Sequence, residues 1–94
     1  MVKDDRGIVL RQAFGRRLRA VRVLRGFKTG DELASAIGIR PEAYRRYERG
    51  EAAPQIDTLE SLRRVLRVSA DWLFYGARAS RAPRIYPRIK RSVR

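Results

Sequence analysis

The stretch "ASAIGIRPEAY", residues 34–44, leaves room for only a very short connection between two helices. Gly38 suits the left-handed conformation that ends a helix, because glycine has no Cβ atom. Pro41 suits the first turn of the next helix, where a backbone N–H would have no intrahelical partner. A connection of three or four residues forces the two helices to cross steeply, with their backbones close together. The sequence therefore predicts a compact pair of helices joined by a tight turn.

Apolar residues recur at helical spacing on both sides of this pair. Before it, one stripe consists of Phe14, Leu18, Val21 and Leu24. After it, a second stripe consists of Ile56, Leu59, Leu62, Val65 and Leu66. We expect each stripe to face the core from an amphipathic helix.

Capping residues set the bounds of the remaining helices. Thr29 and Glu32 have the T-x-x-E spacing of a capping box, which opens the second helix. The third helix is expected over residues 41–49, and Ser69 caps a short fifth helix formed by "ADWLFY", residues 70–75. No segment shows the sustained alternation that is typical of strands. The expected fold class is all-α, with five helices.

Composition points to a polyanionic partner. The chain has 94 residues, with 23 Lys or Arg and 10 Asp or Glu, which gives a formal net charge of +13. Nucleic acid is favoured over an anionic membrane surface as the partner. The absence of cysteine and histidine excludes thiolate and imidazole metal sites and histidine acid–base chemistry. Phosphate-binding GxGxxG and GxxxxGKS/T loops are also missing. We therefore expect no enzyme, no cofactor and no metal.

Charge divides the chain near Gly76. Residues 1–76 contain 16 basic residues and all 10 acidic ones, whereas residues 77–94 contain 7 basic residues and no acidic one. We assign residues 1–9 to an N-terminal extension, 10–76 to the helical domain and 77–94 to a basic tail. No run reaches the roughly 18 apolar residues of a membrane span, and the N-terminus lacks the apolar stretch of a secretory signal. A cytoplasmic protein without membrane contact is expected.

The third helix carries a mainly basic outer face. Ile39, Tyr44 and Tyr47 have the spacing of inward-facing groups, with stacking of the tyrosines on bases as the alternative. The outward residues are then Arg40, Glu42, Arg45, Arg46 and Arg49. A helix is slim enough to enter the DNA major groove, where arginine matches guanine O6 and N7 with two hydrogen bonds. An ordinary solvated face is the other interpretation.

Residues 14–75 resemble the Xre / lambda Cro–repressor helix-turn-helix family of prokaryotic and phage regulators. The resemblance rests on "ELA" (32–34), Gly38, "YERG" (47–50), Pro54 and "TLESLRRVL" (58–66) at the family's spacing. It implies a compact five-helix fold with the helix-turn-helix at the second and third helices. It also implies a sequence-specific transcriptional regulator, a repressor in our interpretation, that binds double-stranded DNA as a dimer and reads it with the third helix.

The resemblance implies roles for individual residues. The base readers are Arg40, Glu42, Arg45 and Arg46. The residues expected at the DNA backbone are Arg17, Thr29, Gly30, Pro41 and Arg49. Arg16 and Arg19 are assigned to the surface or to phosphate contacts without sequence information. Arg22 and Glu48 form a structural ion pair, which we expect to be largely buried.

Two positions depart from the family's pattern. Gly30 stands where the family commonly has glutamine, so this DNA contact is lost or left to the backbone N–H. Pro41 cannot donate a hydrogen bond to a base edge, so we expect specificity to shift onto the arginines. Glu42 either accepts from a cytosine amino group or orients Arg45 or Arg46, and we favour the second role.

Four large apolar residues, "WLFY", lie on barely one helical turn near the end of the domain. One turn cannot bury all of them inside a monomer, so we expect a homodimer interface. Its residues are Trp72, Leu73, Phe74 and Tyr75, with Trp72 or Phe74 facing the partner subunit.

The basic tail allows three interpretations. It is a solvated segment, an arm along the DNA backbone or minor groove, or a segment that orders against a protein partner. Two further function classes therefore stand beside the DNA-binding regulator. One is an antitoxin or co-regulator that acts mainly through protein–protein contacts of residues 72–94, and the other is a non-specific nucleic-acid packaging protein.

Overall fold

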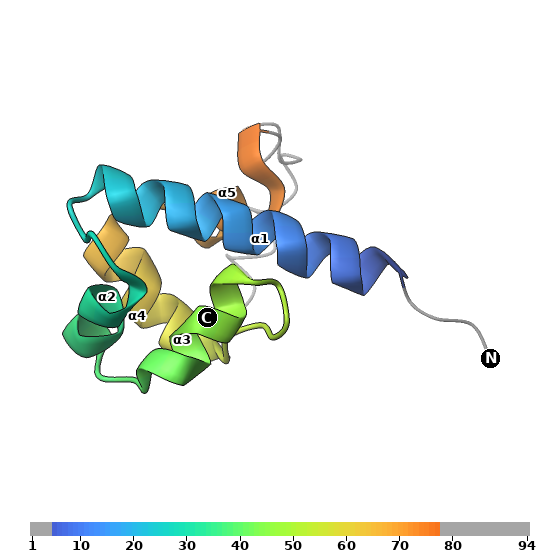
Figure 1. Ribbon diagram of the computed structural model, residues 1–94. Helices are drawn as coiled ribbons and strands as arrows, with labels where there is room; N and C mark the ends of the chain where they lie inside the picture. Colours follow the sequence, from blue (N-terminus) through green and yellow to red (C-terminus); the bar gives the residue numbers. More distant parts are fainter. Residues whose placement is uncertain (1–4, 78–94) are drawn as a thin grey trace, which may run out of the picture.

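The computed structural model describes residues 5–77, and within them every regular element is a helix. The helices are α1 (Asp5–Leu24), α2 (Gly30–Ile37), α3 (Pro41–Glu48), α4 (Ile56–Leu66) and α5 (Ala70–Tyr75) (Figure 1). The expected all-α fold of five helices is confirmed. None of the described helices is long and apolar enough to cross a membrane. The basic tail lies outside the described residues from position 78 onward.

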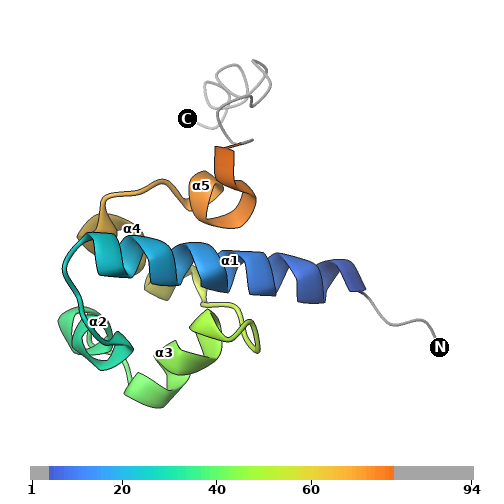
Figure 2. The same ribbon diagram turned by 45° about the horizontal axis from the view of Figure 1, so that its top comes forward.

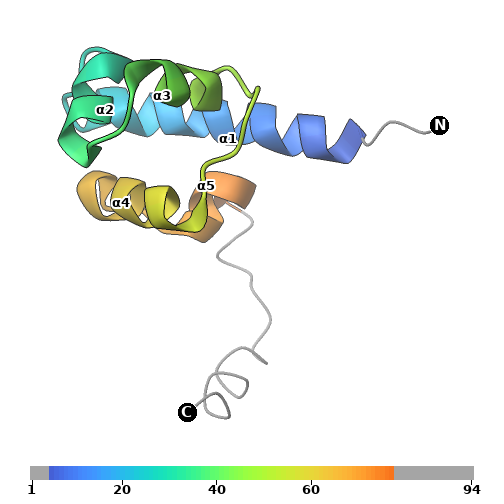
Figure 3. The ribbon, with the colours of Figure 1, turned by 90° about the horizontal axis from the view of Figure 1, so that it is seen from below.

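The other helices are arranged around α1, which is the longest. The α2–α3 pair lies on one side of α1 and α5 lies on the other (Figure 2). In Figure 3, α4 and α5 form a layer opposite α2 and α3. The first turns of α1 project beyond the other helices in these views, and they occupy part of the segment that we assigned to an N-terminal extension. The arrangement leaves one side of α3 at the surface of the domain.

Nine hydrophobic side chains form the core within the described residues. They are Phe14, Leu18, Val21, Leu33, Ala34, Tyr44, Leu62, Leu66 and Leu73. Both expected stripes therefore face the core, with one exception in each: Leu24 is 72% exposed and Ile56 is 85% exposed. Leu24 is the last residue of α1 and Ile56 is the first of α4, so each lies at a helix end that no neighbouring element covers.

Local caps fix the turn between α2 and α3. The Thr29 hydroxyl accepts a hydrogen bond from the Glu32 N–H at 3.2 Å, and the Glu32 carboxylate accepts one from the Lys28 N–H at 2.7 Å. The capping box is thus present, except that the carboxylate bonds the residue before the cap. Gly38 has a φ of 78°, a left-handed value that glycine adopts without strain. These caps set the two ends of α2, and only residues 38–40 separate α2 from α3.

Two glycines allow close approach between elements. A Cβ atom at Gly15 of α1 would collide with the backbone carbonyl oxygen of Glu48, at the end of α3. A Cβ atom at Gly30 would lie 2.8 Å from two ring carbons of Tyr44. Carbon atoms in contact normally lie about 3.5–4.0 Å apart, so either substitution requires a neighbour to move. A larger residue at the start of α2 would therefore fit only if the Tyr44 ring moved.

Arg17 of α1 and Arg25, which directly follows α1, cap helices that lie far away in the sequence. Arg17 Nη1 donates to the carbonyl oxygens of Leu73 and Phe74 at 3.0 and 2.9 Å. Arg25 Nε donates to the carbonyl oxygen of Leu66 at 2.7 Å. These carbonyls belong to the last turns of α5 and α4, where a cation is favoured. The structure thereby corrects the expectation that Arg17 contacts the DNA backbone, since its guanidinium is half-buried inside the domain.

Candidate nucleic-acid interface

The outer face of α3 is exposed and charged. Arg40, Pro41 and Glu42 at its start all lie at the surface. The side chains of Arg45 and Arg46 are 49% and 53% exposed. Because the opposite side of α3 is the one that packs on the core, this face can contact another molecule without any change in the fold.

Acidic residues beside α3 pair with its arginines. Arg45 Nη1 lies 2.8 Å from Asp31, at the start of α2. Arg49 lies 2.9 Å from Glu51, and Arg46 lies 3.9 Å from the same carboxylate. The hydrogen bond between Arg49 and Glu51 lowers the pKa of Glu51 and raises the pKa of Arg49. The single exposed contacts of Arg45 and Arg46 hold these side chains weakly, whereas Arg49 binds Glu51 through two hydrogen bonds.

Glu42 does not pair with Arg45 or Arg46 in the free domain, so the orienting role that we favoured for it stays a prediction. The carboxylates within reach of Arg45 and Arg46 belong to Asp31 and Glu51. Glu42 forms no ion pair within residues 5–77, and its side chain remains at the surface. Acceptance from a cytosine amino group is the other predicted role, and the exposed position of the side chain is compatible with it.

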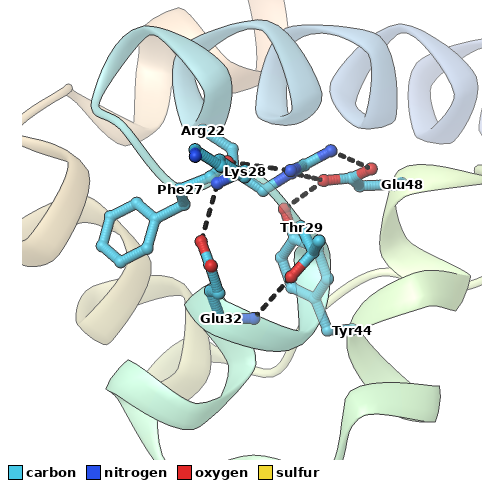
Figure 4. A network of polar contacts seen from close by, with 7 residues as sticks. All are labelled: Arg22, Phe27, Lys28, Thr29, Glu32, Tyr44 and Glu48. Atoms are coloured by element: carbon cyan, nitrogen blue, oxygen red, sulfur yellow. Dashed lines mark hydrogen bonds and ion pairs between the residues drawn. The ribbon is translucent and has the colours of Figure 1, made fainter.

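A buried network fixes α3 against α1 (Figure 4). Arg22 Nε donates to Glu48 Oε2 at 2.6 Å, and Arg22 Nη2 lies 3.5 Å from Glu48 Oε1. The Tyr44 hydroxyl donates to the same carboxylate, and Arg22 Nη1 donates to the carbonyl oxygen of Phe27 at 2.9 Å. The side chains of Arg22 and Glu48 are only 7% and 15% exposed. The expected ion pair is present and largely buried.

Burial and hydrogen bonding within the network shift the pKa values of Arg22 and Tyr44. Burial alone would lower the pKa of Arg22, but the hydrogen bond and the charge of Glu48 raise it overall. Burial, followed by the hydrogen bond to Glu48, raises the pKa of Tyr44 well above its ordinary value of 10.0. Among the described residues, no buried side-chain nitrogen or oxygen lacks a hydrogen-bond partner. Because desolvation offsets much of the attraction within a buried pair, we infer that the network mainly orients α3.

A shallow hollow of about 200 Å³ lies beside this network, between α1 and α3. It is lined by Arg19 of α1 and by Arg45, Glu48 and Arg49. Arg19 is exposed and forms no hydrogen bond or ion pair with any residue that the structure describes. Since Arg22 neutralises Glu48, the three arginines of the lining dominate the charge of this hollow.

The other residues expected at the DNA backbone lie at helix ends. Thr29 caps α2 and Gly30 is its first residue, while Pro41 and Arg49 mark the two ends of α3. The start of α2 adjoins the outer face of α3, because Asp31 of α2 lies 2.8 Å from Arg45. Arg17 is the exception in this set, because its guanidinium group caps the end of α5.

The residues of α5 divide differently from our expectation. Leu73 is fully buried, which removes it from the expected subunit interface because it packs in the core. Trp72 and Phe74 pack partly against the core. Tyr75 is 54% exposed and is the most outward of the four, rather than Trp72 or Phe74.

An apolar hollow of about 300 Å³ adjoins Tyr75. Three parts of the domain line it: the N-terminal half of α1, helix α5, and the loop that follows α3. The lining residues are Gly7, Leu10, Arg11, Phe14, Ala53, Phe74 and Tyr75. Leu10 is 41% exposed, so the apolar surface at the end of the domain continues from α5 onto α1. The sequence stripes did not indicate this continuation, because Leu10 precedes the residues that we assigned to the first stripe.

Comparison with known families agrees with this geometry. A family model described as helix-turn-helix matches residues 18–73, more than half of the chain, and the match includes all of α2 and α3. The chain belongs to the Xre-like helix-turn-helix family. Within this helix-turn-helix domain, α3 is the second helix of the pair and carries the exposed face of arginines.

A curated relative of this helix-turn-helix chain comes from Bacillus subtilis (strain 168). It is named as an SPbeta prophage-derived uncharacterized HTH-type transcriptional regulator, YonR. The two sequences are 38% identical over 66 residues, which make up 70% of this chain and 60% of the relative. The chain thus matches less than two thirds of the relative's length. No solved structure matches the chain.

Proposed function

We propose that this helix-turn-helix protein is a sequence-specific, double-stranded DNA-binding transcriptional regulator. The observation that carries the proposal is the exposed face of α3, on a helix anchored from behind by the buried Arg22–Glu48 pair. The major groove of DNA is about 12 Å wide and admits such a helix. The net charge of +13 favours association with a polyanion. The relative's name, which calls it a transcriptional regulator, supports the same class.

Base reading is assigned to the start and the middle of α3. Arg40, Glu42 and Arg46 lie at the exposed face. Arginine can donate two hydrogen bonds to O6 and N7 of guanine, and glutamate can accept one from N4 of cytosine. Arg46 is 3.9 Å from Glu51, so its guanidinium can turn to a base without the loss of a short ion pair. Arg45 belongs to the same face but also lines the hollow beside α1.

Backbone contacts are assigned to the residues that flank this face. The first turn of α2, at Thr29 and Gly30, presents backbone N–H groups that can donate hydrogen bonds to a phosphate. Pro41 and Arg49 lie at the two ends of α3, and Arg49 adds a positive charge. Such contacts set the position of the domain on the duplex and carry no sequence information.

The active form in this proposal is a homodimer. One recognition helix spans only a few base pairs, whereas two copies related by a twofold axis read half-sites about 34 Å apart. We place the subunit contact at the apolar hollow, where Tyr75 and Leu10 expose apolar surface. Trp72 and Phe74 contribute only the parts that the core leaves uncovered.

Repression in the cytoplasm is the proposed outcome of binding. A dimer bound at a promoter occupies the groove and the backbone that other proteins need, so occupancy alone blocks access. No metal or cofactor takes part in this proposal.

Selection of bound duplexes from a random pool, with the protein alone, tests the proposal. We expect enrichment of one near-palindromic sequence with half-sites about one helical turn apart. Equal recovery of all sequences, with strong salt-dependent binding, would instead identify a non-specific packaging protein.

A protein-binding role is the second candidate, and the apolar hollow beside Tyr75 is the observation that favours it. In that role, residues 72–94 hold an unlike partner, as in an antitoxin or a co-regulator. Co-purification of a stoichiometric partner by the full chain, lost on deletion of residues 77–94, would support this role. Recovery of the homodimer alone would reject it.

A further inference from the structure

We infer that the hollow between α1 and α3 binds a single phosphate group of the DNA backbone. The hollow has a volume of about 200 Å³ and is lined by Arg19, Arg45, Glu48 and Arg49. The inference rests on the proposed function and adds to it the place at which one phosphodiester is held. We call these four residues the phosphate hollow.

The charge of the phosphate hollow selects an anion. Arginine carries a permanent positive charge and matches the oxygens of a phosphate with two parallel hydrogen bonds. Glu48 does not oppose the anion, because Arg22 lies 2.6 Å from its carboxylate and the Tyr44 hydroxyl donates to it. The lining therefore combines three arginines with one acid that is paired with Arg22, while the acids that pair with Arg45 and Arg49 lie outside the lining.

The guanidinium groups are available to a ligand. Arg19 has no partner within residues 5–77, so it retains all of its donors. Arg45 and Arg49 pair with Asp31 and Glu51 through contacts in which the side chains are about half exposed. The Arg45–Asp31 pair is a single exposed hydrogen bond, so a phosphate can replace it at small cost. Arg49 holds Glu51 through Nε and Nη2, and its Nη1 donors remain for a phosphate to share.

The position of the phosphate hollow fits the edge of the major groove. α3 has eight residues, which at 1.5 Å per residue makes a length of about 12 Å. The groove is also about 12 Å wide, so the last turn of α3 lies near the phosphates when its first turn lies at the base edges. Arg45 and Arg49 are four residues apart and thus share one face of that last turn. Arg19 encloses the hollow from α1.

This site changes the role of Arg45. The family resemblance implied base reading at this position, whereas the phosphate hollow uses its guanidinium for the backbone. An arginine that contacts phosphate carries no sequence information. Base discrimination within α3 then rests on Arg40, Glu42 and Arg46.

Substitution Arg19→Gln in the full chain tests the site, since within residues 5–77 Arg19 makes no hydrogen bond or ion pair that the domain would lose. The affinity for a random-sequence duplex is measured over a range of salt concentrations. Affinity decreases with salt, and we expect the magnitude of the slope of log affinity against log salt to become smaller by about 0.9, the value for the loss of one phosphate contact. The sequence enriched from a random pool should remain the same. An unchanged slope or a changed sequence preference would overturn the assignment.

Arg64→Gln is the matched control. Arg64 lies on α4, in the layer opposite α3, and its side chain is 73% exposed. The substitution removes the same charge away from the phosphate hollow, so we expect the salt slope to stay close to that of the unmodified protein. An equal fall of the slope in both variants would reduce the effect to net charge and reject the site.

Inorganic phosphate is a second probe and separates the two sources of the ligand. Chloride at equal ionic strength serves as the reference. We expect the Nε–H resonances of Arg19, Arg45 and Arg49 to shift saturably with phosphate, and this response to be lost in Arg19→Gln. If the resonances shift with free phosphate but Arg19→Gln leaves the salt slope of DNA binding unchanged, the assignment to the DNA backbone is contradicted. If neither the resonances nor the salt slope change, the site is rejected. If the slope falls as expected but no sequence is enriched, the sequence-specific function fails and the phosphate hollow stands.

Discussion

Glu48 is the residue on which the orientation of α3 most depends. Its carboxylate accepts hydrogen bonds from Arg22 and from Tyr44, and thereby joins the end of α3 to α1. Arg22 is nearly inaccessible to water, so it has no other partner of opposite charge to turn to. We therefore expect the exposed arginines of α3 to be held in a less definite direction when this pair is removed.

Removal of the carboxylate tests this dependence. In Glu48→Ala, a buried cation is left unpaired, and we expect the free energy of unfolding to fall by about 3–5 kcal/mol. Thermal unfolding measures the change, and Glu60→Ala is the control because Glu60 pairs only with exposed arginines. A melting temperature that is the same in both variants would show that the buried pair does not hold the domain together.

Tyr44 makes stability dependent on alkaline pH. An unfolded tyrosine loses its proton near pH 10, whereas burial and the hydrogen bond to Glu48 raise the pKa of folded Tyr44 above that value. The folded state therefore binds the proton more tightly, so its contribution is complete below pH 10 and is lost as pH rises above it. We expect the free energy of unfolding to fall above pH 10, and to fall less in Tyr44→Phe. Denaturant unfolding between about pH 8 and pH 11 measures both, and parallel curves would contradict the prediction.

The individual roles of the arginines were the least predictable feature at this scale. The resemblance to the family indicated the Arg22–Glu48 pair. Nothing in the sequence distinguished Arg17, which caps α5, from Arg19, which lines the phosphate hollow. The carbonyl groups that Arg17 reaches are 56 and 57 positions away, so only the packing of α5 on α1 reveals the contact.

The elements themselves were more predictable, because their signals are local. Gly38 and the Thr29–Glu32 box fixed the bounds of α2 within a few residues. The ends of the apolar stripes were not predictable in this way, since spacing shows which face is apolar but not how far a neighbouring helix extends. Leu24 and Ile56 are exposed for that reason.

The crossing of α1 and α3 depends on Gly15. A Cβ atom at this position meets the carbonyl oxygen of Glu48, a backbone atom that cannot turn aside. In Gly15→Ala we expect a loss of about 1–3 kcal/mol in the free energy of unfolding, as for other overpacked sites. Helix propensity alone predicts the opposite sign, since alanine is favoured over glycine by about 1 kcal/mol. Thermal unfolding decides between them, with the exposed neighbour Arg16→Ala as the control. A more stable Gly15→Ala variant would mean that the helices can separate freely.

At the scale of the whole molecule, the apolar hollow and the α3 face lie on different parts of the domain. The hollow is formed by α1, α5 and the loop after α3, whereas the exposed face of α3 is flanked by α2. One copy can therefore contact DNA and a second copy at the same time. The sequence indicated surplus apolar residues at α5, but it could not show that Leu73 is internal and that Leu10 joins the surface.

Tyr75→Glu tests the proposed dimer. A carboxylate at the apolar hollow would be desolvated on association, so we expect a folded monomer with unchanged helical circular dichroism and without cooperative DNA binding. Leu24→Glu is the control, because Leu24 is 72% exposed and lies at the other end of α1. Sedimentation of the three proteins measures the oligomeric state. A Tyr75→Glu protein that remains dimeric would place the subunit contact elsewhere.

The central claim is that the outer face of α3 reads DNA sequence, and the affinity ratio of Arg46→Ala tests it most directly. The ratio compares a duplex selected from a random pool with a random-sequence duplex of the same length, at one salt concentration. We expect Arg46→Ala to lower the affinity for the selected duplex by about 1–3 kcal/mol more than the affinity for the random one. Arg64→Ala, on the opposite layer, should leave the ratio unchanged. A ratio that Arg46→Ala does not alter would contradict the assignment of sequence reading to this face.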